Sequence, residues 1–192
     1  MGKNKFSFFI LLFFLLVQAN ILRSQSLQTI PKIGLGINGV DFSIEIPVDK
    51  KITIEPAVGV GPTYKKTDWD EYVPPSNEIS YFDQGLHVSM YGKYLYNRNR
   101  RLNKGKSLHL NSGNFIGMKV WYVSKPFNNE EYLYNTILVN LNWGGQRNIG
   151  RYWIYSYSLG LGWGYNIDIP YDCLHLAIDL KMAYVLPFLS KK

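Results

Sequence analysis

The segment CLHLAIDLKMAYVLPF, from Cys173 to Phe188, alternates between two kinds of residue over its whole length. Every even-numbered position is large and apolar, whereas the odd-numbered positions include His175, Asp179 and Lys181. Successive side chains of a strand point to opposite faces, so this pattern predicts a strand with one apolar and one polar face. Strands of globular proteins are about 5 to 6 residues long, whereas a tilted strand that crosses a bilayer needs about 9 to 11. The segment therefore predicts a membrane-crossing strand of a β-barrel.

The N-terminus has the pattern of an export signal. Two lysines within the first five residues precede an apolar run from Phe6 to Val17. This run is too short for a transmembrane helix, which needs about 20 residues, and it therefore predicts a cleaved signal peptide. Cleavage after Ala19 and cleavage after Ser26 both suit the preference for small residues. We take residues 1–26 as the signal peptide and 27–192 as one domain.

Composition excludes several classes of function. The precursor has a net charge of +7, and residues 1–26 hold three basic residues and no acid, so 18 basic against 14 acidic residues leave +4. An excess of that size does not indicate nucleic-acid binding. The single cysteine, Cys173, excludes an internal disulfide and forms no metal-ligand pattern. We expect no cofactor and no metal.

Alternation and turn residues together predict eight strands. Asn38-Gly39 is typical of a tight hairpin and separates the first two, although residues 33–48 could instead form one bent strand and give seven. An even number keeps both termini on the periplasmic side of a bacterial barrel and therefore favours eight. Pro56, Pro62, Ser112 and Asn114 predict bulges or strand ends. The predicted strands cover 33–37, 40–48, 52–64, 81–96, 107–123, 134–144, 152–167 and 173–188.

The seventh predicted strand indicates which face meets lipid. Its odd-numbered face has Trp153 and Tyr155 at one end, Trp163 and Tyr165 at the other, and leucines between them, as expected for aromatic girdles around an apolar band. Its even-numbered face is small and uncharged, whereas the surface of a soluble barrel would carry charge. The sequence thus predicts an all-β, closed, antiparallel up-and-down transmembrane barrel.

With the apolar face outward, ionisable residues of the strands alternate into the lumen. Charges enclosed in a membrane barrel must be paired or hydrated, so we expect an internal salt-bridge network, with a proton relay or ion path as the alternative. The predicted network comprises Glu45, Glu55, Asp83, His87, Lys93, His109, Lys119, His175, Asp179 and Lys181.

Charges in the turns separate by end. Strand parity places a basic turn at the periplasmic end, where it would contact anionic headgroups or dock an anionic periplasmic partner or the cell wall. This turn comprises Arg98, Arg100, Arg101, Lys104 and Lys106, and the same end would hold Lys50, Lys51, Arg147, Arg151, Lys191 and Lys192. The opposite, external end would hold Asp68, Asp70, Glu71, Glu78, Glu130, Glu131, Asp168 and Asp172.

One enzymatic hypothesis rests on His87-Val88-Ser89. A histidine two residues from a serine on a strand shares its face and could act as the base for a nucleophile. The element is similar to the His-x-Ser-Asn element of outer-membrane lipid A deacylases, with Met90 in place of the asparagine. The resemblance would imply release of fatty acid from lipid A by Ser89.

The export signal, the eight alternating runs, the glycine-rich inward faces and the closing segment from Leu180 to Phe188 together resemble small outer-membrane barrels of the OmpX and OmpA-transmembrane-domain kind. The resemblance implies insertion by the barrel assembly machinery, which in that family recognises the last strand and its terminal aromatic residue; here four residues follow Phe188.

We therefore expect a protein of a Gram-negative-type outer membrane, in contact with lipid and lipopolysaccharide, with a structural, envelope-anchoring or surface-binding role, a side-chain-filled lumen and no enzymatic activity. The alternatives are a soluble, exported, lipocalin-like ligand-binding barrel and a deacylase-like hydrolase that uses His87 and Ser89.

Overall fold

The computed structural model describes residues 27–66, 77–126, 133–168 and 171–187, and nearly all of its regular structure is β-strand. The signal peptide predicted for residues 1–26 lies outside the described residues. In chain order the elements are β1 (Ile30–Gly36), β2 (Gly39–Pro47), β3 (Ile52–Lys66), β4 (Asn77–Tyr94), α2 (Arg98–Asn103), the 3₁₀ turn η1 (His109–Asn111), β5 (Gly113–Pro126), the short β6 (Leu133–Tyr134), β7 (Thr136–Ile149), β8 (Trp153–Asn166) and β9 (Tyr171–Val185). None of the helices in the described part of the chain is long and apolar enough to cross a membrane.

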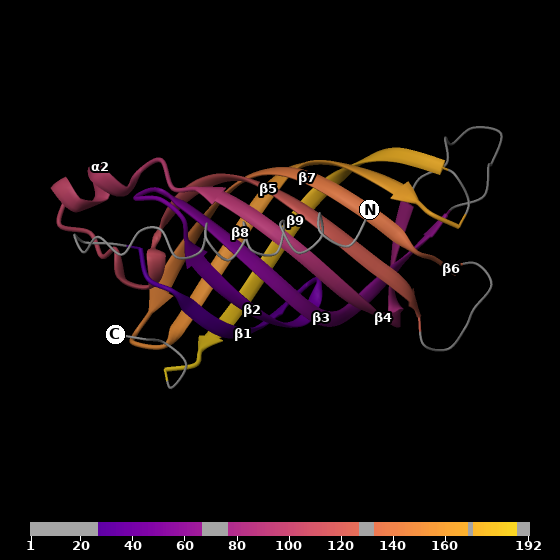
Figure 1. The fold of residues 1–192 in the computed structure, drawn as a ribbon, viewed down its shortest axis with the longest axis horizontal. Coiled ribbons are helices and arrows are strands. Elements are labelled where there is room, and N and C mark those ends of the chain that lie inside the picture. Colours follow the sequence, from indigo (N-terminus) through magenta and orange to yellow (C-terminus); the bar gives the residue numbers. More distant parts are fainter. Residues whose placement is uncertain (1–26, 67–76, 127–132, 169–170, 188–192) are drawn as a thin grey trace, which may run out of the picture.

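Eight strands form a closed antiparallel barrel. Each long strand pairs with the next along the chain, and β1 pairs with β9 to complete the circle (Figure 1). The two-residue β6 is a minor addition that pairs with the end of β3. The predicted all-β up-and-down barrel of eight strands is therefore confirmed. Seven strands are excluded because Gly36 pairs with Gly39 across a tight turn, where Gly39 has a φ of +98°, a left-handed conformation that favours glycine.

The strands are strongly staggered. If each residue is followed to its partner on the next strand, a path that begins at Ile33 of β1 goes once around the barrel and reaches β9 at Asp172. The direct partner of Ile33 on β9 is Tyr184, so the stagger is twelve residues. With a rise of about 3.3 Å per residue and a strand spacing of about 4.8 Å, this stagger tilts the strands by about 45° from the barrel axis.

The prolines have different effects. The register of β3 against β4 shifts between Pro62 and Thr63, as the sequence predicted, but Pro56 lies in regular register opposite Met90. The Ile52 carbonyl accepts from the N–H of Val48, the residue after β2, so even-numbered residues of β3 point their backbone groups toward β2. The pairing of β2 with β3 is interrupted at Pro56, which has no paired residue on β2. The N–H that proline lacks is therefore not needed for a hydrogen bond between these strands.

The start of the fifth strand was predicted wrongly. It was expected at 107, but β5 begins at Gly113, because the chain before it turns into the barrel mouth. Leu110 and Asn111 have positive φ angles of 50° and 54°, and both side chains are buried. Such a conformation is unusual for residues other than glycine and ends the extended chain.

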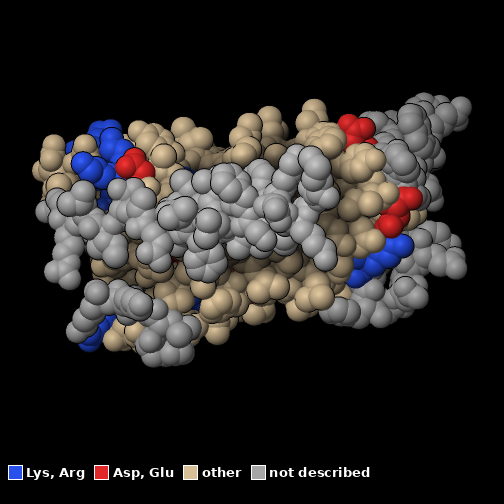
Figure 2. All heavy atoms as spheres, viewed as in Figure 1, with Lys and Arg blue, Asp and Glu red and all other residues tan. Residues whose placement is uncertain are grey.

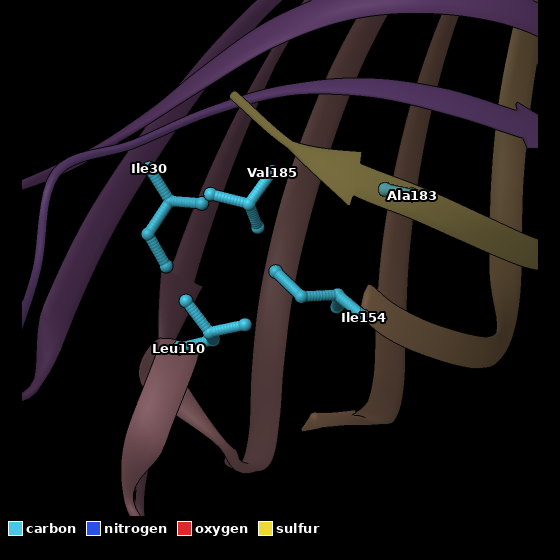
Figure 3. Packing of buried hydrophobic residues seen from close by; sticks show 5 residues of the cluster. All are labelled: Ile30, Leu110, Ile154, Ala183 and Val185. Atoms are coloured by element: carbon cyan, nitrogen blue, oxygen red, sulfur yellow. The ribbon is translucent and has the colours of Figure 1, made fainter. Parts of the chain in front are cut away.

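Apolar side chains close this mouth of the barrel. Ile30, Leu110, Ile154, Ala183 and Val185 form a buried cluster that joins the first and last strands to the connection before β5 (Figure 3). A second cluster of Leu27, Tyr91, Leu95 and Phe115 lies within the barrel. The lumen is thus packed with side chains, as expected for an eight-stranded barrel.

Candidate functional site: a charged lumen inside an apolar wall

The outer surface of the barrel is apolar. Large hydrophobic side chains on every long strand are exposed, with Leu35, Leu141, Leu161 and Leu176 each between 63% and 68% exposed. Charged side chains gather mostly at the two ends of the barrel (Figure 2). Exposed apolar patches on soluble monomers rarely exceed a few hundred Å², so this wall is built to contact something other than water.

Aromatic residues stand at both ends of the apolar surface of β8. Trp153 and Tyr155 lie toward one end and Trp163 and Tyr165 toward the other. The Trp163 indole donates to the Asp172 carboxylate over 2.8 Å, while the ring of Trp153 packs 5.2 Å from that of Tyr184. Ten residues separate the two tryptophans, which at a tilt of about 45° corresponds to a band about 23 Å tall, close to the apolar band of outer-membrane barrels, about 25 Å.

The centre of the lumen holds two lysines between two glutamates. Lys32 lies 3.1 Å from the Glu45 carboxylate and 3.0 Å from that of Glu55. Lys93 contacts the same carboxylates at 3.5 and 2.5 Å. All four side chains are less than a tenth exposed, so each charge depends on the others for compensation.

Neighbouring polar groups complete this network. Gln146 accepts from Lys93 at 3.2 Å and donates to Glu45 at 3.0 Å, which bridges opposite charges. Asn111 donates to the other Glu45 oxygen at 3.2 Å and so ties the turn before β5 to the network. The Glu45 carboxylate therefore has partners for both of its oxygens, which favours its charged form.

Two further ion pairs extend along the lumen. Lys181 donates to Asp41 over 2.6 Å and lies 3.6 Å from Glu55, while Lys119 donates to Asp179 over 3.2 Å. With the central four residues, the network contains four lysines and four carboxylates, so its formal charge is zero. A cavity of about 30 Å³ lies among these side chains, enough space for water but not for a larger ligand.

The structure brings most of the predicted lumen residues together. Glu45, Glu55, Lys93, Lys119, Asp179 and Lys181 belong to the network, and His87 and His175 also face the lumen. Asp83 is half-buried on β4, where its backbone carbonyl accepts from Thr63.

His109 lies elsewhere than expected. It is exposed on η1, at the end of the barrel, where a ring nitrogen lies 3.2 Å from the Arg151 carbonyl. The expectation assumed that 107–112 is part of a strand, and the inward turn of that segment removes His109 from the alternation.

Two network members were missed by the sequence reasoning. Lys32 precedes the first predicted strand by one residue, but β1 begins at Ile30 and so places Lys32 in the lumen. Asp41 alternates with Val40 and Phe42, so the same pattern that selected Glu45 could have identified it.

The two histidines of the lumen are packed against other side chains. The His87 ring meets the Trp121 ring edge-on at 5.4 Å, and neither of its nitrogens has a recorded hydrogen bond. His175 lies 3.0 Å from the Asn140 side-chain oxygen. A Cβ on Gly162 would fall 2.5 Å from the His175 ring, so the glycine makes room for it. Within the described residues, no group of three or more His, Cys, Asp or Glu side chains could hold a metal ion.

The proposed hydrolytic pair lies inside the barrel. His87 and Ser89 are 4% and 7% exposed, whereas Met90 beside them is exposed on the outer face. A lipid substrate in the membrane would meet Met90 rather than Ser89.

The end of the barrel that carries α2 is basic. Arg98 is buried there, and Arg101 donates to the Ser107 carbonyl over 2.7 Å, so part of the predicted basic turn has a structural role. Arg100, Lys104 and Lys106 are exposed at this end.

At the opposite end, Asp168 organises a polar network. It accepts from the Asn135 backbone N–H at 2.8 Å and lies 3.4 Å from Lys125. Slight burial would raise the pKa of the Asp168 carboxyl, but the Asn135 hydrogen bonds and Lys125 outweigh it and lower this pKa. Of the acidic residues predicted for this end, Asp68, Asp70, Glu71, Glu130 and Glu131 lie outside the described residues.

Comparison with models of protein families, with curated proteins and with solved structures finds no match to this chain.

Proposed function

We propose that this chain is a small integral outer-membrane β-barrel protein with a closed lumen and a structural, envelope-anchoring or surface-binding role. The observation that carries the proposal is the inverted distribution of polarity. Apolar side chains cover the outside of the barrel, and a neutral network of eight charges, four of them buried and four partly buried, fills the inside. A bilayer is the solvent in which this arrangement is favourable, because a closed barrel satisfies the backbone internally and the wall contacts acyl chains.

The proposed function does not include transport of large solutes. The apolar clusters and the salt-bridge network occupy the lumen, and the cavity of about 30 Å³ among the network side chains is the size of a water site. The connections at the end opposite α2 would present the binding surface to the exterior.

Neither alternative gains support from the geometry. A soluble ligand-binding barrel of the lipocalin kind needs an apolar interior and a charged exterior, the reverse of the arrangement described here. A hydrolase acting on membrane lipid needs His87 and Ser89 near the lipid face, whereas both are buried in the lumen.

The test is fractionation of cells that express the full chain, followed by electrophoresis with and without heating. We expect the protein in the outer-membrane fraction, with a heat-dependent change in mobility that indicates a folded barrel. Recovery in the soluble periplasmic fraction would refute the proposal. In planar bilayers we expect no large, stable conductance, and a wide open pore would refute the closed lumen.

A further inference from the structure

The end of the barrel that carries α2 holds positive charge that no carboxylate side chain of this protein balances. Lysine and arginine side chains gather at that end (Figure 2), where Arg100, Lys104, Lys106 and Arg151 are exposed. Within the described part of the chain, none of these four forms an ion pair. Asp49 is the only acidic residue in the described turns and helices of this end.

Segments outside the described residues cannot supply the missing negative charge. Residues 1–26 and 188–192 contain five lysines and arginines and no aspartate or glutamate. The acidic residues of 67–76 and 127–132 belong to connections that start and finish at the opposite end of the barrel. A ten-residue connection that returns to its end reaches out by at most about 19 Å, whereas β3 alone extends about 33 Å along the barrel axis. The positive charge is therefore available to a partner that is not part of this chain.

Two arginines at this end lie close together. Arg101 of α2 donates to the Ser107 carbonyl over 2.7 Å. The Ser107 hydroxyl in turn donates over 3.2 Å to the side chain of Asn148, which directly follows Arg147 on β7. Desolvation, and after it the positive charge of Arg147, lower the pKa of the Arg101 guanidinium against the opposing effect of Tyr155. Two like charges at such a separation repel, so an anion bound between them would stabilise both.

Both guanidinium groups retain N–H donors for such an anion. A guanidinium has five N–H donors in a planar arrangement that suits phosphate. Arg147 uses three of them, toward two backbone carbonyls at 2.8 Å each and toward the Asn114 side-chain oxygen. Arg101 uses two, both toward the Ser107 carbonyl. These bonds also hold the two side chains in place, so a ligand would not have to order them.

Arg147 lies at the border of the apolar wall, on the face that points away from the lumen. Trp143, four residues earlier on the same face of β7, is exposed, and Tyr155, the partner of Arg147, is one of the aromatic residues at that end of β8. Four residues of a strand tilted by about 45° correspond to about 9 Å along the barrel axis. Because tryptophan and tyrosine gather at membrane interfaces, Arg147 lies at the depth of lipid headgroups.

We propose that Arg101 and Arg147 bind the phosphate of one anionic phospholipid at the α2 end of the barrel. The remaining N–H groups of both side chains would donate to the phosphate oxygens. An acyl chain would lie against Trp143 and its neighbours on the adjacent strands, Ile116 and Leu159, which are 55% and 56% exposed. Since the described residues place no carboxylate beside the two arginines to hold an ammonium group, the site favours headgroups that lack one.

This inference rests on the proposed membrane location, and it names a lipid that would anchor the α2 end in the envelope. The two arginines and their contacts depend only on the fold. The binding experiment therefore uses the purified full chain in detergent, separately from the fractionation of cells that tests the location.

The experiment counts the lipids bound to the full chain by native mass spectrometry. Phosphatidylglycerol is the anionic probe, and phosphatidylcholine, which carries an ammonium group, is the comparison. We expect one phosphatidylglycerol to bind with a dissociation constant about 10- to 30-fold lower than that of phosphatidylcholine, as expected for two basic residues at a membrane surface.

Substitutions separate the site from the general positive charge. Arg101→Gln combined with Arg147→Gln should weaken phosphatidylglycerol binding by about 10- to 30-fold. Lys50→Gln combined with Lys51→Gln is the matched control, because it removes the same charge from the same end and should leave the affinity nearly unchanged. Arg147 also bonds to the backbone, so Arg101→Gln alone is the second variant, with an expected loss of about 3- to 10-fold. The heat-dependent gel shift verifies that each variant is folded.

Equal affinities for the two lipids, or equal losses in the arginine and lysine variants, would show a diffuse effect of charge and would overturn the proposal. Displacement of phosphatidylglycerol by an excess of inorganic phosphate would assign the site to free phosphate and would likewise overturn a lipid occupant. Recovery of the chain in the soluble fraction of cells would instead overturn the proposed membrane location, while the affinities measured in detergent would stand.

Discussion

Replacing Lys93 with methionine tests whether the lumen network stabilises the fold as a unit. Lys93 is 4% exposed and contacts Glu55, Glu45 and Gln146, so its removal leaves two buried carboxylates with less positive charge beside them. Breaking a buried ion pair by removing one partner costs about 3 to 5 kcal/mol, because the remaining charge is uncompensated. We expect the free energy of unfolding of the Lys93→Met variant to fall by about that amount.

The assay is denaturant unfolding of the full chain in lipid vesicles, followed by tryptophan fluorescence and by the heat-dependent gel shift. Lys119→Met is the matched control. Lys119 has one carboxylate partner, Asp179, and both side chains are partly exposed, at 14% and 20%, so the loss should be about 1 kcal/mol. The difference in burial alone predicts that Lys93→Met lowers the free energy of unfolding more than Lys119→Met does.

A second substitution separates charge from packing. Glu55→Gln in the Lys93→Met background restores the balance of charges, and we expect it to recover part of the lost stability, with a coupling of about 1 to 3 kcal/mol between the two positions. A loss below about 1 kcal/mol for Lys93→Met, or purely additive effects of the two substitutions, would refute the view that the network is a compensated unit.

Three further predictions concern the wall, the glycines and the end of the barrel opposite α2. Leu159→Arg, in the middle of the apolar band and 56% exposed, should cost about 2 to 4 kcal/mol in vesicles, whereas Leu102→Arg on α2 should cost about zero; equal costs would contradict a lipid-facing wall. Gly160→Ala would place a Cβ 1.9 Å from the Leu141 carbonyl oxygen and should lower stability by about 1 to 3 kcal/mol, while Gly92→Ala, whose nearest contact is 3.9 Å, should be nearly neutral by the same unfolding assay. The lowered pKa of Asp168 means that its hydrogen bonds to Asn135 stabilise the end of the barrel opposite α2 above the ordinary pKa, 3.8, and that this stabilisation is lost as the pH falls through the folded-state value. The Asn135 amide resonance should therefore titrate below about pH 3.8, and no titration, or the same titration in Asp168→Asn, would reject the assignment.

Much of the fold could be predicted because alternation is a local property. A residue's face on a strand depends only on its parity, so the stretch from Leu174 to Tyr184 was sufficient to place leucines on one side and Asp179 and Lys181 on the other. The division at Asn38-Gly39 was equally local, because a two-residue turn depends on the conformations that its own residues allow.

The errors arose where long-range contacts override local pattern. The segment before Gly113 has residues compatible with a strand, yet Asn111 bonds to Glu45 and Leu110 joins an apolar cluster with Ile30 and Val185, and these contacts favour an inward turn. The same turn explains why His109, which was predicted to face the lumen, is exposed at the end of the barrel. Lys32 was missed because the start of β1 depends on its pairing with β2 and β9 rather than on its own sequence.

The sequence by itself determined most of the strands and which side chains share a face, because these follow from the period of two along a single strand. Only the tertiary structure decided which charges meet, since Lys32 of β1 and Lys93 of β4 both reach Glu55 inside the closed barrel. It also decided that β9 extends further than its pairing with β1, because the length over which two strands pair depends on both segments and cannot be predicted from either one alone. Whether a residue number is odd or even along a strand predicts whether its side chain lies inside or outside the barrel, whereas closure of the sheet determines which side chains contact one another in the lumen.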